Sequence, residues 1–192
     1  MRARIAIALA ALAVSGCAGD SSGLPESALS TVVLQLADLP KPFQQFDEGR
    51  QGSAETTGAF RTDPGRFGRV DGWKARYRRP GTASTPGPLV IESRVDLFGD
   101  DDGAAKDLEA YRREFEQAVQ ATRGRLLAPL ELVSEAVGIT FREDRVRFFR
   151  IAWRHANTTA LLFVNGFDQR LELNDVLELA RKQQRRLEDA AR

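Results

Sequence analysis

"LVIESRVDLFGDDDGAAKDLEAYRREFEQAVQAT", residues 89–122, decides the fold because two secondary-structure periods follow one another in it. Residues 89–97 alternate between apolar and charged side chains, the period of a half-buried strand. We expect Glu92, Arg94 and Asp96 on its solvated face. After the acidic cluster, apolar residues recur at steps of three and four, which predicts one stripe of a helix. This stripe consists of Ala104, Leu108, Tyr111, Phe115, Ala118 and Thr122.

The acidic cluster at residues 100–102 has two interpretations. Aligned with an EF-hand calcium loop, Gly103 takes the sixth position and Glu109 the twelfth, as that motif requires. The first ligand position, however, falls on Phe98, and Lys106 at the ninth adds a cation. The alternative is a helix N-cap with carboxylates near the positive end of the helix dipole. We predict the cap, with no metal site and no cofactor.

The N-terminus has the features of an export signal. Arg2 and Arg4 precede the apolar stretch at 5–14, which is too short to span a bilayer comfortably. It ends in "VSGC", residues 14–17, which resembles the lipobox of bacterial lipoprotein signal peptides. In that family the cysteine receives a diacylglycerol, and the peptide is cut before it. The alternative is a plain secretory signal with a chance cysteine.

The resemblance implies that Cys17 is lipidated and that the protein is anchored outside the cytoplasm of a bacterium. We therefore divide the chain into a signal peptide at 1–16, a lipidated tether at 17–26 and one domain at 27–192. Cys17 is the only cysteine of the 192 residues, so the chain can form no internal disulfide.

The formal net charge of the chain is +1 and falls to about −1 without Arg2 and Arg4. This near-neutral charge argues against nucleic-acid binding.

The remaining segments complete an α+β pattern. We expect a strand at 73–79, a hairpin at 135–155 with a bulge at Phe148–Phe149, and a central strand at 158–167. A final helix starts with Asn174 as its N-cap. Residues 31–36 fit either a strand or a short helix.

These elements predict an antiparallel sheet of about five to seven strands packed by at least two long helices. With "LADLP" and the closing "RFFRIAWRHANTTALLFV", the chain resembles small extracytoplasmic lipoproteins of the PsbP/Mog1-like type. Their activity is often unknown, so this resemblance implies a fold rather than a function.

Catalytic motifs are missing from the sequence. It contains one histidine, His155, and neither a G-x-S-x-G elbow nor a phosphate-binding loop. A zinc site would lack the usual His or Cys pairs. We place His155 at the surface, beside a turn, and expect no enzymatic activity.

A basic and aromatic stretch at 61–80 is the strongest charge feature, with seven basic and two acidic side chains. Lys74, Arg76 and Arg78 share one strand face, and Arg79 follows at the turn. Such a patch can bind anionic polymers or lipid headgroups. Alternatively, its aromatic residues face the core and its arginines are only the solvated side of the strand.

Two functional classes fit these observations. The first is a membrane-anchored binding or interaction module that recognises an unknown protein, envelope component or apolar ligand. The second is a sensor or accessory subunit of an envelope complex, and a cryptic hydrolase is a distant third. A pocket lined by the sheet and closed by a helix would favour a small ligand, whereas a flat aromatic patch would favour a protein partner.

Overall fold

A computed structural model describes residues 23–51, 63–127, 130, 132 and 135–192. The strands are β1 (Gln44–Arg50), β2 (Arg69–Arg78), β3 (Val90–Phe98), β4 (Arg125–Leu126), β5 (Ala136–Glu143), β6 (Val146–His155) and β7 (Thr158–Phe167). The α-helices are α1 (Leu29–Val32), α2 (Asp101–Thr122) and α3 (Leu173–Ala190). Short 3-10 turns are η1 (Glu26–Ala28), η2 (Leu36–Asp38) and η3 (Pro64–Phe67). The predicted α+β class is therefore confirmed.

All seven strands form one antiparallel sheet in the order β1-β2-β3-β7-β6-β5-β4. The fourth place belongs to β7, as its apolar residues at both parities predicted. β5 and β6 form the expected hairpin, but their register runs without a shift through Phe148 and Phe149. The predicted bulge is therefore wrong: Phe149 is buried in the larger core, whereas Phe148 is half-buried on the other face, against the rings of Phe141 and Phe163.

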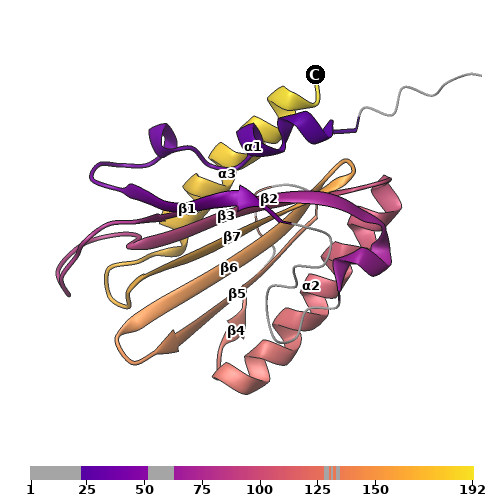
Figure 1. The fold of residues 1–192 in the computed structure, drawn as a ribbon. Coiled ribbons are helices and arrows are strands. Elements are labelled where there is room, and N and C mark those ends of the chain that lie inside the picture. Colours follow the sequence, from indigo (N-terminus) through magenta and orange to yellow (C-terminus); the bar gives the residue numbers. More distant parts are fainter. Residues whose placement is uncertain (1–22, 52–62, 128–129, 131, 133–134) are drawn as a thin grey trace, which may run out of the picture.

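The sheet separates two helical layers (Figure 1). One face packs against α1 and α3 and forms the larger core, which includes Tyr77, Ile91, Trp153 and Leu162. The other face packs against α2 and forms a smaller core around Phe115 and other side chains of the predicted stripe. Within the described residues, no helix is long and apolar enough to cross a membrane.

The N-terminal segment is tied closely to this framework. Residues 31–36, for which strand and helix were both open, contain the end of α1 and the start of η2. Leu24, which the sequence placed in the tether, is already buried, and its backbone N–H donates to Asn157 Oδ1 at 2.8 Å. Asp38 binds Arg186 of α3 at 2.7 Å. The segment after residue 23 is therefore part of the packed domain.

Both long helices begin with side-chain caps. Asp100 Oδ1 accepts from the backbone N–H of Gly103 at 2.8 Å, so the predicted N-cap of α2 is confirmed. The N-cap predicted for α3, Asn174, is wrong. Glu172 takes that position and forms a capping box with Asp175, whose carboxylate accepts from the Glu172 backbone N–H at 2.9 Å.

Candidate functional site

A stripe of charged side chains runs along β3 beneath α2. The stripe consists of Glu92, Arg94 and Asp96, whose side chains lie on the sheet face that α2 covers. In the β3–β7 ladder their partners are Phe163, Leu161 and Thr159, respectively. The solvated face that the sequence predicts for these residues is wrong for Arg94 and Asp96. Arg94 and Asp96 are instead 0 % and 1 % exposed, because β3 lies inside the sheet and is covered on both sides. The stripe therefore passes from the interior to a half-buried end at Glu92.

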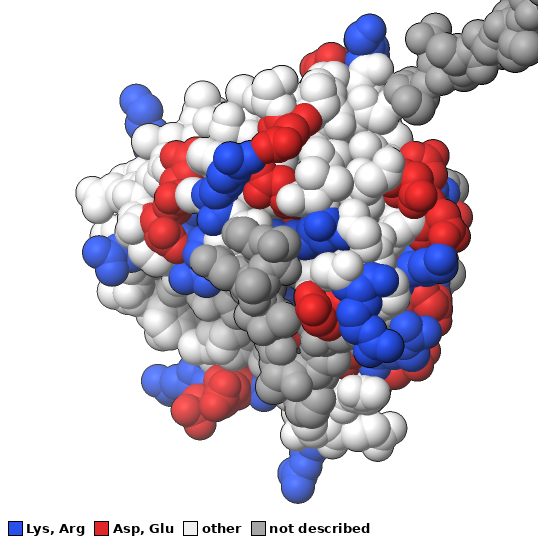
Figure 2. All heavy atoms as spheres, turned by 45° about the vertical axis from the view of Figure 1, so that its right-hand side comes forward, with Lys and Arg blue, Asp and Glu red and all other residues white. Residues whose placement is uncertain are grey.

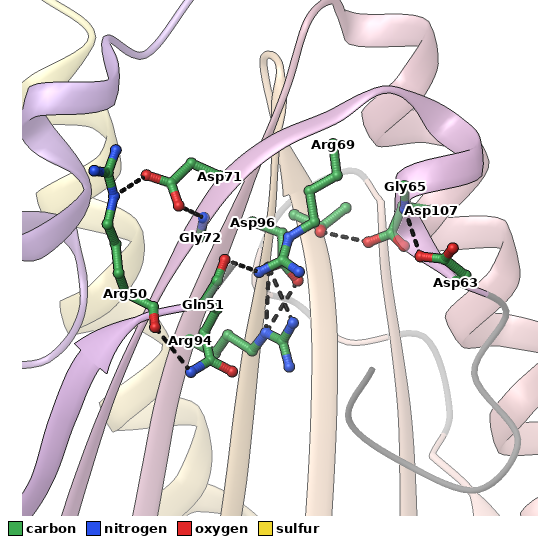
Figure 3. A network of polar contacts seen from close by, with 11 residues as sticks. Arg50, Gln51, Asp63, Gly65, Arg69, Asp71, Gly72, Arg94, Asp96 and Asp107 are labelled. Carbon is green, nitrogen blue, oxygen red and sulfur yellow. Dashed lines mark hydrogen bonds and ion pairs between the residues drawn. The ribbon is translucent and has the colours of Figure 1, made fainter. Parts of the chain in front are cut away.

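The buried end of the stripe is an ion-pair network (Figure 3). Asp96 lies between two guanidinium groups, with Oδ1 2.7 Å from Arg69 Nη2 and Oδ2 3.1 Å from Arg94 Nε. Arg69 also donates to the backbone carbonyl of Gln51 at 2.9 Å. Gly72 leaves the room for this network, since a Cβ there would lie 2.5 Å from Asp96 Oδ1 and closer still to Arg69.

A second buried contact joins α2 to the sheet next to this network (Figure 3). The Thr159 hydroxyl of β7 donates to Asp107 of α2 at 2.6 Å, and the Asp107 side chain is fully buried. Buried charges that lose a partner are strongly destabilising, so these contacts fix α2 in one position on the sheet. They are enclosed, and we therefore assign them a positioning role.

The half-buried end of the stripe opens into a groove of about 200 Å³ between α2 and the sheet. We call this hollow the α2 groove. Its lining residues come from four strands and the helix, and they are Arg76, Glu92, Tyr111, Glu114, Phe115, Arg150, Leu161 and Phe163. The groove is thus lined by the sheet and closed by a helix.

Two ion pairs flank an aromatic floor in the α2 groove. Arg76 Nε lies 2.6 Å from Glu92 Oε2, and Arg150 Nη1 lies 3.0 Å from Glu114 Oε1. The Arg150 guanidinium also lies over the Phe163 ring, 5.5 Å from its centroid, in a cation–π contact. The groove therefore offers two cations, two carboxylates and an apolar surface within one small space.

Both arginines keep part of their hydrogen-bonding capacity. Arg76 and Arg150 have exposed side-chain fractions of 36 % and 32 %. A guanidinium carries five N–H donors, and the ion pairs use only some of them. On the side of the molecule that carries α2, basic and acidic side chains are mixed rather than segregated (Figure 2). The groove thus suits a ligand with both signs of charge better than a simple anion.

The predicted contact residues have partners in the structure. Lys74 pairs with Asp47 at 3.0 Å, Arg78 stacks over Phe46, and Arg79 stacks over Phe43. Arg79 also donates to the backbone carbonyls of two prolines, Pro86 and Pro88. Of the four predicted residues, only Arg76 reaches the α2 groove. Binding of an anionic component by this patch stays a prediction, and Cys17 lies outside the described residues.

His155 is half-buried at the end of β6, and its Nδ1 lies 3.2 Å from Gln184 Nε2. Burial lowers its pKa below the ordinary value of 6.5, although Glu188 and Asp101 act in the opposite direction. Among the described residues, no group of three or more His, Cys, Asp or Glu side chains could hold a metal ion.

Sequence reasoning missed Glu92, Glu114, Arg150 and Phe163 as groove residues. A usable signal was present for Glu114, which lies between Tyr111 and Phe115 of the apolar stripe. An acidic residue next to a buried stripe is expected to be buried too, and a buried carboxylate needs a cation or a hydrogen-bond donor beside it. That partner, Arg150, is 36 residues away in the chain, so the pairing required the fold.

The comparisons with known proteins identify a structural likeness. The crystal structure of the extracellular domain of PknH from Mycobacterium tuberculosis matches with a TM-score of 0.61 and 12 % identity. The match covers 87 % of this chain and 98 % of that one, so the two share a fold. A GTP binding regulator from Thermotoga maritima gives a TM-score of 0.44 at 10 % identity, covering 84 % of this chain and 91 % of that one, which supports no argument. No family model and no curated protein sequence matches the chain.

Proposed function

We propose that this protein is a lipid-anchored, extracytoplasmic binding module that holds a small zwitterionic ligand with an apolar body in the α2 groove. The observation that carries the proposal is the pairing of two cations and two carboxylates around Phe163 in a hollow of about 200 Å³. The lipid anchor rests on the "VSGC" motif at residues 14–17. The fold of the PknH extracellular domain supports a location outside the membrane.

The groove chemistry favours a small ligand over a protein partner. A ligand carboxylate would accept from the unused N–H groups of Arg76 and Arg150, which retain exposure. A ligand ammonium would lie against Glu92, whose Oε2 is the atom that binds Arg76. The apolar body would contact Phe163 and Leu161 on the floor. Each part of the ligand thus has a named counterpart.

The rigid frame under the groove supports binding without a large rearrangement. The Asp96 network and the Asp107–Thr159 contact hold β3 and α2 in place on the buried side of the groove. Preorganised sites lose less free energy on ordering their side chains when a ligand binds. The residues that line the groove include no Ser, Thr, Cys, Lys or His, which are the usual nucleophiles and bases of covalent catalysis, so we propose binding rather than catalysis.

The test is a calorimetric titration of the full chain in nonionic detergent with three related probes. Phenylalanine carries both charges, whereas N-acetylphenylalanine lacks the cation and phenylalanine methyl ester lacks the anion. We expect phenylalanine to bind about tenfold more tightly than either derivative, because each derivative loses a charge-assisted hydrogen bond. Equal affinity for all three, or no binding of any, would contradict the proposal.

Two groove variants and one matched control sharpen this titration. Arg76→Gln should weaken the binding of phenylalanine and of its N-acetyl derivative, which both carry the carboxylate. Glu92→Gln should weaken the binding of phenylalanine and of its ester, which both carry the ammonium. The control is Lys106→Gln, which removes a cation from the exposed surface of α2, where Lys106 pairs with Asp102 outside the groove. This variant should leave the affinity for all three probes unchanged.

A further inference from the structure

A second hollow lies at the opposite end of α2 from the Asp100 cap. It has a volume of about 440 Å³ and is formed where the helix ends and β4 joins the edge of the sheet. We call it the arginine hollow. Its lining residues are Thr122, Arg123, Gly124, Arg125, Thr140, Phe141, Arg142 and Arg147.

Positive charge dominates the arginine hollow. Arg142 and Arg147 share one carboxylate, Asp168, at 2.7 Å each. Neither Arg123 nor Arg125 forms an ion pair within the part of the chain that the structure describes. Four arginines and no acidic residue thus line the hollow, and two of these arginines pair with Asp168 beside it, in contrast to the balanced charges of the α2 groove.

The backbone directs these arginines toward one space. Arg123 is the C-cap of α2, and its φ of 53° turns the chain back toward the sheet. Arg125 then lies beside Thr140 in the β4–β5 ladder, while Arg142 lies opposite Arg147 in the β5–β6 ladder. Glu143, the next residue after Arg142, points to the other face of the sheet because side chains alternate along a strand.

The first described residues lie far from the arginine hollow. Leu24 is bound to Asn157, in the turn just after the end of β6, whereas Arg147 lies near the start of that strand. Arg147 and His155 are separated by eight residues of β6, or about 27 Å at about 3.4 Å per residue. With the anchor of the proposed function at Cys17, the hollow lies on the end of the domain remote from the attachment point.

We propose that the arginine hollow binds the phosphate groups of a molecule outside the anchoring membrane. Guanidinium groups match phosphate oxygens with paired N–H donors, which makes arginine the preferred residue for such recognition. Arg123 and Arg125 supply unpaired donors, and Arg142 and Arg147 supply donors not used by Asp168. Phosphate binding itself requires no lipid anchor. Only the statement that the hollow faces away from the anchoring membrane rests on the anchor of the proposed function.

Inorganic tripolyphosphate is the probe for this site. Its binding to the full chain in nonionic detergent is measured by calorimetry, for the native sequence and for the double variant Arg123→Gln/Arg125→Gln. We expect the variant to bind at least about tenfold more weakly, because charge-assisted hydrogen bonds are lost. The double variant Arg181→Gln/Arg185→Gln removes two exposed arginines of α3 outside the hollow and should bind as the native chain does.

Equal weakening in both double variants would overturn the site, since the effect would then be one of overall charge. Absence of binding to the native chain would overturn it as well. Thermal unfolding of both variants checks that each remains folded.

A vesicle experiment distinguishes the source of the phosphate. Cys17→Ala chains, which lack the lipid, are sedimented with vesicles of phosphatidylglycerol and of phosphatidylcholine. We expect Arg123→Gln/Arg125→Gln to leave sedimentation with both vesicle types unchanged. Loss of sedimentation with phosphatidylglycerol in that variant would identify a lipid headgroup as the ligand and overturn the proposed location outside the membrane.

Discussion

Gly72 is the residue on which the buried network under α2 depends most directly. A methyl group at this position would meet both Arg69 and Asp96, whose side chains are 0 % and 1 % exposed and have no free space to move into. We predict that Gly72→Ala lowers the free energy of unfolding by about 3 kcal/mol, through overpacking and the loss of a buried ion pair.

Urea denaturation measures the effect of Gly72→Ala, and Gly49→Ala in β1 is the matched control. A Cβ at Gly49 would meet nothing within 4 Å, so that variant should unfold within about 0.5 kcal/mol of the native chain. Equal stabilities of the two variants would contradict the role of Gly72.

The burial of His155 predicts a stability that depends on pH. Burial, the largest cause, lowers its folded pKa below the ordinary value of 6.5, so the unfolded chain binds a proton more readily. The stabilising contribution is therefore present above about pH 6.5 and is lost as the pH falls below it. We predict that the free energy of unfolding decreases between pH 7.5 and pH 5.5, measured by urea denaturation.

The control variant His155→Gln should reduce this decrease, because glutamine does not titrate. Burial acts to raise the pKa values of Asp38 and Asp168, but hydrogen bonds and nearby cations together lower both below the ordinary value of 3.8, so these groups lie outside this window. An unchanged slope in His155→Gln would show that other groups cause the effect.

At the scale of elements, the N-cap of α2 is a local feature with a testable free energy. Asp100 satisfies the backbone N–H of Gly103 at 2.8 Å. Asp100→Ala should lower the free energy of unfolding by about 1 kcal/mol, and Asp100→Ser should restore most of it, because serine also caps helices well.

Calorimetry with calcium should give no dissociation constant tighter than about 1 mM. Micromolar binding that Asp100→Ala abolishes would favour the loop interpretation instead.

The elements themselves were largely predictable from sequence periodicity. The steps of three and four after Gly103 gave α2, and the apolar run at 158–167 gave the central strand. The burial of β3 was not predictable, because charged residues that alternate with apolar ones give the same sequence pattern on a solvent-exposed face and in a buried ion-pair network. Asp96 finds its partner Arg69 on another strand, 27 positions away. Only the strand order reveals that pairing.

For the whole molecule, the proposed function depends on a lipid anchor at Cys17 that would hold the domain outside the cytoplasm. We predict that Cys17→Ala abolishes incorporation of radiolabelled palmitate and releases the protein from the membrane fraction, because the thioether attachment site is lost. The control Ser15→Ala, which keeps a small residue before Cys17, should behave as the native chain does. Normal processing and membrane fractionation of Cys17→Ala would contradict the anchor.

The candidate site was predictable only in part at this scale. The basic stretch directed attention to Arg76, which does line the α2 groove. The other three predicted contact residues, Lys74, Arg78 and Arg79, bind partners that come from β1, from the segment before it and from the turn before β3. The composition of the sequence gives the number of charges but not their partners. The equal number of cations and carboxylates in the groove depends on the fold, which brings β2, β3, β6 and α2 together.

Hydrogen exchange of backbone amides tests most directly whether the α2 groove is the ligand site. The full chain in nonionic detergent is compared with and without saturating phenylalanine, and exchange is followed by mass spectrometry. We predict slower exchange in two of the segments that line the groove, residues 111–115 of α2 and 161–163 of β7, and no change in the arginine hollow at residues 122–125. Unchanged exchange in 111–115 and 161–163, or slowing confined to other segments, would contradict it.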